Sequence, residues 1–265
     1  MKIGFIGTGN MGGALATAAA KTDAGILLCN RTMAKAEALA QALKCNTATA
    51  QEIAATCDYI FLGVKPQMMG DLLSSLAPTL SSRTTPFVLV SMAAGLTMQT
   101  LQQMAGGNYP TIRIMPNTPV AVGSGVILYD ATENVTAEAL TGFLKAMSQA
   151  GFLDRLPEKL IDAGSAVSGC GPAFVSMFIE ALSDGGVACG LPREKALALA
   201  AHTLQGTAAL LLETGKHPGV LKDEVCSPGG STIQGVKALE NGNLRATVMA
   251  AVQAAHTRNQ ELGKS

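Results

Sequence analysis

The chain has 265 residues, a length that accommodates one large domain or two ordinary ones. Its 19 Lys and Arg residues balance 19 Asp and Glu residues, so no net charge attracts nucleic acid or an anionic membrane. Charged residues make up only 14% of the sequence, aromatic residues 4%, and Trp is absent, which also argues against a base-stacking surface. The composition predicts a protein that binds neither nucleic acid nor membranes and buries apolar surface in subunit contacts.

The six cysteines form no Cys-x-x-Cys pair and the three histidines lack metal-ligand spacing, so we expect no metal site. The opening residues Met1 to Gly7 lack the apolar segment and cleavage site of a secretory signal. Pro, Gly, Gln and Asn interrupt every long uncharged stretch before it reaches about 20 apolar residues. Reduced thiols in a cytoplasmic protein are therefore the expectation.

Five short apolar runs alternate with helical patterns in the first half of the chain. Such runs are typical of parallel strands buried on both faces, and they cover residues 2–6, 26–30, 59–64, 87–92 and 111–115. Helical periodicity lies between them, for example over 33–43 and, after a Lys65-Pro66 start, over 68–76. The alternation predicts an α/β fold with a doubly wound sheet.

Strand patterns end near residue 153, and Ala- and Leu-rich helical patterns continue to the C-terminus. We therefore predict a dinucleotide-binding domain over residues 1–152 and an all-helical domain over residues 153–265. Two segments, 168–172 and 226–232, each end one helix and begin another. Pro172 suits the first turn of a helix that extends to Cys189, and Ser231 with Gln234 has the spacing of a capping box.

The segment Gly7-Thr8-Gly9-Asn10-Met11-Gly12 follows the first predicted strand and opens a helical pattern. In this context Gly-x-Gly-x-x-Gly is typical of a Rossmann-type dinucleotide site. Gly7 would permit the tight turn, Gly9 would let a pyrophosphate approach the backbone, and Gly12 would let the helix pack closely on the strand. An ordinary glycine-rich turn is the alternative.

Asn30, Arg31 and Thr32 end the second predicted strand, where an NAD site normally places Asp or Glu against the ribose hydroxyls. A guanidinium and two neutral polar side chains suit a 2′-phosphate instead. The expected cofactor is therefore NADP, with NADPH preferred over NADH. The alternative is that Thr32 caps the next helix and Arg31 is a solvated charge, and the two roles are compatible.

Three further loops are expected at the carboxyl edge of the sheet, where open α/β sheets bind their ligands. They combine small residues with prolines, which leaves room for a flat cofactor, and Asn117 could address an amide group. Each loop alone is equally typical of a structural turn. The residues assigned to cofactor contact here are Val64, Lys65, Pro66, Ala93, Ala94, Gly95, Met115, Pro116 and Asn117.

The loop at residues 228–232 places two glycines before a predicted helix in the second half of the chain. Backbone N–H groups that such a turn leaves unpaired form an anion-binding nest, and the helix dipole reinforces it. A small carboxylate would fit this nest. The alternative is a glycine-rich connection between two helices.

Together these segments resemble the pyrroline-5-carboxylate reductases, which reduce a cyclic imine to L-proline with NAD(P)H. The resemblance covers essentially the whole chain, including the Asn-Arg-Thr, Gly-Val-Lys-Pro, Met-Pro-Asn-Thr-Pro and Ser-Gly-Cys-Gly-Pro-Ala segments. Its most specific part runs from His217-Pro218-Gly219 through Asp223 to Ser227-Pro228-Gly229-Gly230-Ser231-Thr232-Ile233. It implies a Rossmann-type domain followed by an all-α dimerisation domain that interlocks with a partner subunit, in a homo-oligomer.

The resemblance also assigns a site for the small imino acid substrate. It implies that Ser231 and Thr232 lie at the substrate's carboxylate and ring nitrogen, and it places Glu158 near the ligands. Ser231 is often Ala or Thr in the family, and Glu224 falls where some relatives carry Asn, so Glu224 receives no role. The substrate-binding residues are Ser227, Gly229, Gly230, Ser231, Thr232 and Glu158, and Thr232 is the catalytic candidate.

Two other functions remain open from the residues alone. A related reductase that acts on a hydroxy acid or another imine would normally need a Lys or His acid, and His202 and His217 are candidates. His202 lies in an Ala- and Leu-rich pattern and is expected in the core. A non-catalytic NADP(H) sensor would have no need of the anion nest.

If the imine substrate of a pyrroline-5-carboxylate reductase arrives protonated, no side-chain acid is required, and the rate comes from orientation and electrostatic preorganisation.

Overall fold

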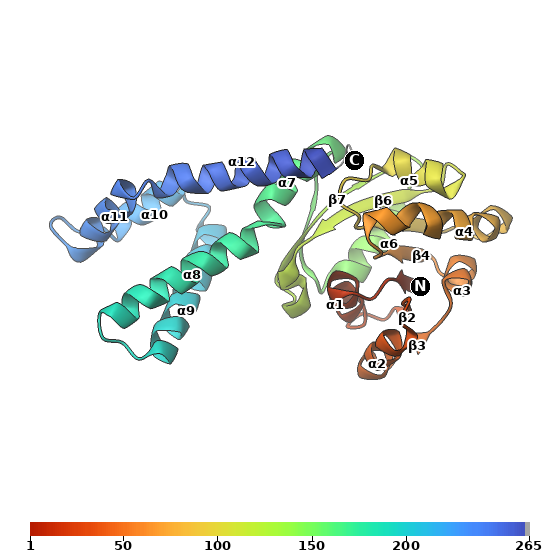
Figure 1. Cartoon of the computed structure of the whole chain (residues 1–265), viewed down its shortest axis with the longest axis horizontal. Coiled ribbons are helices and arrows are strands. Elements are labelled where there is room, and N and C mark those ends of the chain that lie inside the picture. Colours follow the sequence, from red (N-terminus) through yellow and green to blue (C-terminus); the bar gives the residue numbers. More distant parts are fainter. Residues whose placement is uncertain (263–265) are drawn as a thin grey trace. The chain divides into compact units, whose positions relative to one another are not determined.

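A computed structural model describes residues 1–262 and divides the chain into two compact units (Figure 1). We call them the sheet unit, which comprises Met1–Cys170 and the segment from Ala255 onward, and the helical unit, Gly171–Ala254. The domain boundary predicted at residue 152 lies inside a strand, because the pairing of β8 (Gly151–Arg155) keeps this segment in the sheet. Residues 263–265 of the predicted helical domain lie outside the described residues.

The sheet unit is built on a sheet that contains eight strands within the described residues, in the order β3-β2-β1-β4-β5-β6-β7-β8. Neighbouring strands pair in parallel except β6 and β7, which are antiparallel. The other bounds are β1 (Lys2–Ile6), β2 (Gly25–Cys29), β3 (Asn46–Thr47), β4 (Tyr59–Leu62), β5 (Val88–Ser91), β6 (Thr111–Pro116) and β7 (Gly125–Ala131). Strands β1, β2, β4, β5 and β6 agree with the sequence prediction to within two residues at each end.

Helices cover both faces of this sheet, as a doubly wound fold requires. On one face, Ile3 and Phe5 of β1 pack in a cluster with α1, α2 and α6; on the other, Ile60 and Leu62 of β4 pack with α3, α4 and α5. The predicted α/β fold class is confirmed. The helices are α1 (Asn10–Ala19), α2 (Met33–Leu43), α3 (Ala50–Thr56), α4 (Met69–Ser82), α5 (Met98–Ala105), α6 (Ala137–Met147) and α7 (Glu158–Ser168), with short 3₁₀ turns η1 (Pro66–Met68) and η2 (Thr118–Val122).

The helical unit begins with α8 (Gly171–Ala188) and α9 (Arg193–Thr214), which pack against each other. It continues with α10 (Pro218–Glu224), α11 (Ser231–Asn241) and α12 (Leu244–Leu262), whose last turns belong to the sheet unit. Pro172 lies in the first turn of α8, as predicted. In the sheet unit, the amide of Asn259 on α12 donates to the Asp162 carbonyl of α7, with 3.2 Å between nitrogen and oxygen.

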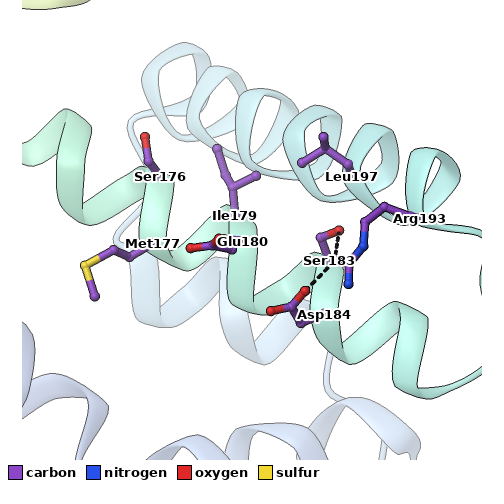
Figure 2. Close-up of a pocket in the computed structure, with 8 residues that line it drawn as sticks. All are labelled: Ser176, Met177, Ile179, Glu180, Ser183, Asp184, Arg193 and Leu197. Atoms are coloured by element: carbon purple, nitrogen blue, oxygen red, sulfur yellow. Dashed lines mark hydrogen bonds and ion pairs between the residues drawn. The ribbon is translucent and has the colours of Figure 1, made fainter.

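Most apolar side chains of α8 and α9 are uncovered within the single chain. Among the described residues of these helices, burial is confined to Ser183, Ala196 and Ala200. A hollow of about 680 Å³ lies on this surface. Figure 2 shows its lining, in which Met177, Ile179 and Leu197 lie among polar and charged side chains. By length and composition alone, the segments Glu158–Ala188 and Arg193–Thr214 could also cross a membrane, a property that core helices of soluble proteins share.

Two local predictions are wrong. Ser231 does not cap α11: Gly230 is the N-cap, and no side chain among the described residues caps the helix. The reason is a backbone turn from Gly230 N–H to the Ser227 carbonyl at 3.0 Å, after which Ser231 is already helical. His202 is exposed rather than in the core, because α9 buries a narrow stripe through Ala196 and Ala200, and a residue two positions further lies on the other side of a helix.

Candidate nucleotide and substrate sites

The turn after β1 requires glycine at two positions. Gly7 has a φ of +101°, and a Cβ there would lie 2.6 Å from the carbonyl group of Gly63 at the end of β4. A Cβ on Gly12 would lie 2.1 Å from the Gly7 carbonyl oxygen. These are the steric roles that the sequence predicts for the two residues. The turn therefore brings β1, β4 and the start of α1 into backbone contact.

The same turn leaves space and unpaired donors at the N-terminus of α1. Gly9 is the N-cap, and a Cβ built on it would meet no atom within 4 Å. The buried Thr8 hydroxyl has no hydrogen-bond partner among residues 1–262. A helix N-terminus with open space and an orphaned donor fits a phosphate group, because its N–H groups and dipole favour negative charge.

A cavity of about 630 Å³ opens from this turn along the carboxyl ends of β1, β2 and β4. It carries two cationic side chains, Arg31 and Lys65, and one carboxylate, Asp71 in the first turn of α4, whereas no acidic residue ends β2. Burial raises the pKa of the Cys29 thiol, which also lines the cavity, so the thiol stays neutral beside these cations. The predicted cofactor residues that line it are Gly7, Gly9, Asn30, Arg31, Val64 and Lys65.

The other residues predicted around the nucleotide lie beside this cavity. Asn10 and Met11 form the first turn of α1, and Pro66 begins η1. Thr32 is the N-cap of α2, but its exposed hydroxyl makes no capping hydrogen bond. The capping role offered as an alternative for Thr32 is therefore filled by its backbone alone, and its side chain stays available to a ligand.

The loops that follow β5 and β6 lie at the same edge of the sheet. Ala93 and Met115 are buried, and Gly95 has a φ of +77°. The Ala93 amide donates to the Ser91 hydroxyl at 3.3 Å. The predicted cofactor residues at this edge are Ala93, Ala94, Gly95, Met115, Pro116 and Asn117.

The side-chain amide of Asn117 is used within the chain. Its nitrogen donates to the Ser168 carbonyl at the end of α7 at 2.9 Å, and its oxygen accepts from the Val126 amide at 2.8 Å. A contact between this side chain and a cofactor amide would have to share or break these bonds. Asn117 therefore connects the turn after β6 to β7 and to the end of α7.

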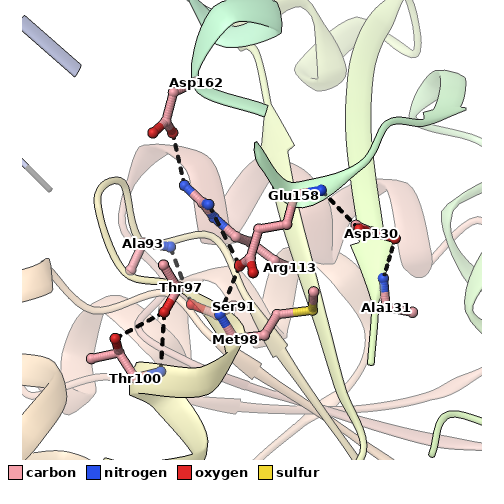
Figure 3. Close-up of polar contacts among 10 residues, drawn as sticks. All are labelled: Ser91, Ala93, Thr97, Met98, Thr100, Arg113, Asp130, Ala131, Glu158 and Asp162. Atoms are coloured by element: carbon pink, nitrogen blue, oxygen red, sulfur yellow. Dashed lines mark hydrogen bonds and ion pairs between the residues drawn. The ribbon is translucent and has the colours of Figure 1, made fainter. Parts of the chain in front are cut away.

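Sequence reasoning missed a buried ionic cluster between β6 and α7 (Figure 3). The Arg113 side chain on β6 is only 3% exposed, and it lies 2.8 Å from Asp162 and 3.5 Å from Glu158, both on α7. Its Nε has no partner among the described residues. The available signal was one arginine in the otherwise apolar run Thr111–Pro116, because a buried charge is rarely left unpaired.

Glu158 connects three elements of the sheet unit. Its Oε1 accepts a 2.7 Å hydrogen bond from the Met98 amide at the start of α5, and its own amide donates to Asp130 on β7 at 2.8 Å. The same Oε1 faces Arg113. The carboxylate predicted near the substrate is thus bonded to the backbone and to a buried cation.

The loop predicted to hold the substrate lies in the helical unit and is largely exposed. Gly229 has a φ of +69°, which favours glycine, whereas the Gly230 amide is occupied by the Ser227 carbonyl. Because no side chain among the described residues caps α11, its first N–H groups lack a side-chain acceptor. The exposed hydroxyls of Ser227, Ser231 and Thr232 lie in the same segment.

The fold and the nucleotide cavity define a Rossmann-type oxidoreductase of the NADP-linked class. Residues 2–95 match the family model described as NADP oxidoreductase, coenzyme F420-dependent. Residues 158–262 match the model described as pyrroline-5-carboxylate reductase dimerisation. The predicted order of a Rossmann-type domain and an all-α dimerisation domain is therefore confirmed.

Full-length relatives identify the family. A pyrroline-5-carboxylate reductase of Arabidopsis thaliana is 41% identical over 100% of this chain and 96% of its own, and one of Escherichia coli K12 is 39% identical over 100% and 99%. The crystal structure of a Plasmodium falciparum pyrroline carboxylate reductase with NADP bound has a TM-score of 0.86 and 33% identity, covering 99% of this chain and 98% of that one. The chain belongs to the pyrroline-5-carboxylate reductase family.

Proposed function

We propose that this chain reduces 1-pyrroline-5-carboxylate to L-proline with NAD(P)H, the last step of proline biosynthesis. The observation that carries the proposal is the full-length similarity to pyrroline-5-carboxylate reductases, which spans the nucleotide-binding and dimerisation regions together. Similarity in only one of these regions would be equally compatible with an NADP(H) sensor or with a different reductase.

The nucleotide site holds NADP(H), with NADPH preferred over NADH, and the bound cofactor supplies the hydride. The backbone N–H groups at the open N-terminus of α1 and the orphaned Thr8 hydroxyl donate to the phosphates. Arg31 at the end of β2 binds the 2′-phosphate, with Asn30 and Thr32 beside it. A guanidinium is suited to this role because its donors match the geometry of phosphate oxygens.

The substrate site uses the segment from Ser227 to Thr232. The uncapped first turn of α11 and the Ser231 hydroxyl bind the substrate carboxylate, since helix N-termini attract anions. Gly229 supplies the left-handed turn that aims this backbone. The Thr232 hydroxyl hydrogen-bonds the ring nitrogen as the C=N carbon accepts a hydride and a protonated imine becomes an amine. No other acid is needed when the imine arrives protonated.

The working protein is a homodimer in the cytoplasm. The exposed apolar side chains of α8 and α9, together with the match to a dimerisation model, support a partner of the same sequence. Obligate interfaces resemble a core cut in half, and the many exposed apolar side chains of α8 and α9 have this character. The six cysteines are free thiols, as suits a reducing compartment.

The test is oxidation of NADPH by the purified protein in the presence of 1-pyrroline-5-carboxylate, with L-proline identified by mass spectrometry. Omission of the imine measures background oxidation, and the Thr232→Val variant is the active-site control. Tight NADPH binding without imine-dependent oxidation would support the sensor instead. Oxidation with a different imine or a keto acid only would indicate another reductase.

A further inference from the structure

The start of α5 depends on a residue from a distant part of the chain. Thr97 is the N-cap, and its hydroxyl accepts from the Thr100 amide at 3.1 Å. The Met98 amide, in the first turn, has no intrahelical acceptor, as is general for the first N–H groups of a helix. Glu158, 60 residues away, accepts from it at 2.7 Å. The carboxylate therefore completes the cap of α5 from outside the helix.

This contact also fixes the loop that leads into α5. The loop leaves β5 at Met92, and its first turn is held where the Ala93 amide donates to the buried Ser91 hydroxyl. Glu158 holds the other end through Met98 (Figure 3). Ala93, Ala94 and Gly95, which the sequence assigns to the cofactor, lie between the two anchors. A shift at Met98 would therefore move these residues.

Arg113 holds the Glu158 carboxylate in position. It lies on β6 in register with Ser91, the last residue of the neighbouring β5. Its buried guanidinium pairs with Glu158 and with Asp162, and a buried cation is costly without such partners. The two carboxylates differ in one respect: Glu158 also accepts a hydrogen bond from the start of α5, whereas Asp162 makes no hydrogen bond or ion pair with the loop or α5 among the described residues.

We propose that Glu158 is a positioning residue for cofactor binding and not a substrate contact. Its carboxylate, held by Arg113, fixes Met98 and thereby the loop at residues 93–95 in the conformation that receives the cofactor. This inference rests on the proposed function, which gives that loop its contacts with NADPH. It replaces the role near the substrate that the family resemblance implies for Glu158.

Three conservative variants separate the contacts of this cluster. Glu158→Asp keeps the charge that Arg113 needs, but its side chain is one methylene shorter and no longer reaches the Met98 amide. Glu158→Gln keeps an oxygen acceptor for Met98 and loses the charge. Asp162→Asn is the matched control, because it weakens the pairing of Arg113 and leaves the Met98 contact intact. The measurement is the Kd of NADPH by fluorescence titration without imine, with the melting temperature of each variant.

Positioning predicts that Glu158→Asp weakens NADPH binding about tenfold, the effect of one hydrogen bond to a charged group. Asp162→Asn should bind NADPH close to wild type, even where its melting temperature falls. Glu158→Gln should weaken NADPH binding less than Glu158→Asp does, because it keeps the acceptor for Met98 and loses only the ion pair with Arg113. Equal weakening in all three variants would assign the effect to Arg113 and overturn the proposal. Unchanged NADPH binding with a raised KM for the imine would make Glu158 a substrate contact. Because no imine is present, the titration gives its answer even if the proposed reaction is not observed.

Discussion

The end of β2 carries Arg31 and no Asp or Glu, and this absence indicates which cofactor the site binds. A carboxylate there would repel a 2′-phosphate, whereas the structure places a guanidinium in the cavity wall and leaves the Thr32 hydroxyl without a capping bond. The composition of this strand end was readable from the sequence. The open space beside Gly9 and the orphaned Thr8 hydroxyl were not, because both depend on how β1, β4 and α1 meet.

The Arg31→Asp variant should bind NADPH about 10- to 100-fold more weakly, since a charge-assisted hydrogen bond contributes roughly 1.5 to 3 kcal/mol. Binding of NADH should be retained or improved, because the new carboxylate can accept from the ribose hydroxyls. Isothermal titration with both nucleotides measures the effect. Equal weakening for NADPH and NADH would show that Arg31 does not recognise the 2′-phosphate.

Thr232→Val removes the hydroxyl and keeps the branched shape, so kcat should fall more than KM for the imine rises. The loss of one preorganised donor has cost about 10² to 10³ in kcat in other enzymes, which sets the upper range. Steady-state kinetics on variants with matched melting temperatures provide the measurement. Unchanged kcat and kcat/KM would exclude the hydroxyl from the mechanism.

Gly230→Ala should show the opposite kinetic pattern. A Cβ at this position would lie 2.4 Å from the Ser227 hydroxyl oxygen, so that side chain must rotate and the turn that holds the carboxylate is crowded. The substrate carboxylate is bound in the ground state and the transition state alike, so KM should rise while kcat changes less. A kcat loss at constant KM would contradict this assignment.

At the level of elements, sequence periodicity predicted the five strands with continuous apolar runs in the βαβ alternation and missed β3, β7 and β8. β3 has only two residues, and β8 is a largely exposed edge strand that ends in Asp154 and Arg155, so neither has the continuous apolar pattern. β7 does contain an apolar run, Gly125–Leu128, yet it pairs antiparallel with β6 and falls outside the βαβ alternation that guided the prediction. Pairings that join distant segments, such as Arg113 with Glu158, have no local signature.

Asn117 connects three elements, and its loss should be costly for that reason. Asn117→Ala would leave the part-buried Ser168 carbonyl and Val126 amide without their side-chain partner. We expect about 1–3 kcal/mol of lost stability per unsatisfied buried group as the upper range. Urea unfolding of the variant measures the change. As a control, Asn134→Ala removes exposed hydrogen bonds and should lower the free energy of unfolding by less. An equal decrease in the two variants would contradict the connecting role of Asn117.

For the whole molecule, the exposed apolar surface of α8 and α9 should control assembly. Met177 on α8 is 69% exposed in the single chain, and Met177→Glu would place a charge where a partner subunit is expected to pack. Sedimentation velocity should show a shift to monomer, while NADPH binding to the sheet unit is retained. Val122→Glu, at a 76% exposed position in the sheet unit, is the matched control and should leave assembly unchanged. An unaltered dimer in Met177→Glu would place the interface elsewhere.

The chain leaves the sheet unit at Cys170 and re-enters it at Ala255, so the helical unit is an insertion within the sheet unit. All eight strands of the described sheet have been synthesised by Arg155, but Asn259, which bonds the Asp162 carbonyl of α7, is translated only after the whole helical unit. On the ribosome, the nascent sheet can therefore form long before α7 receives its final contact. A ribosome-stalled chain that ends before Ala255 should already contain the nucleotide cavity while the C-terminal end of α12 is still missing.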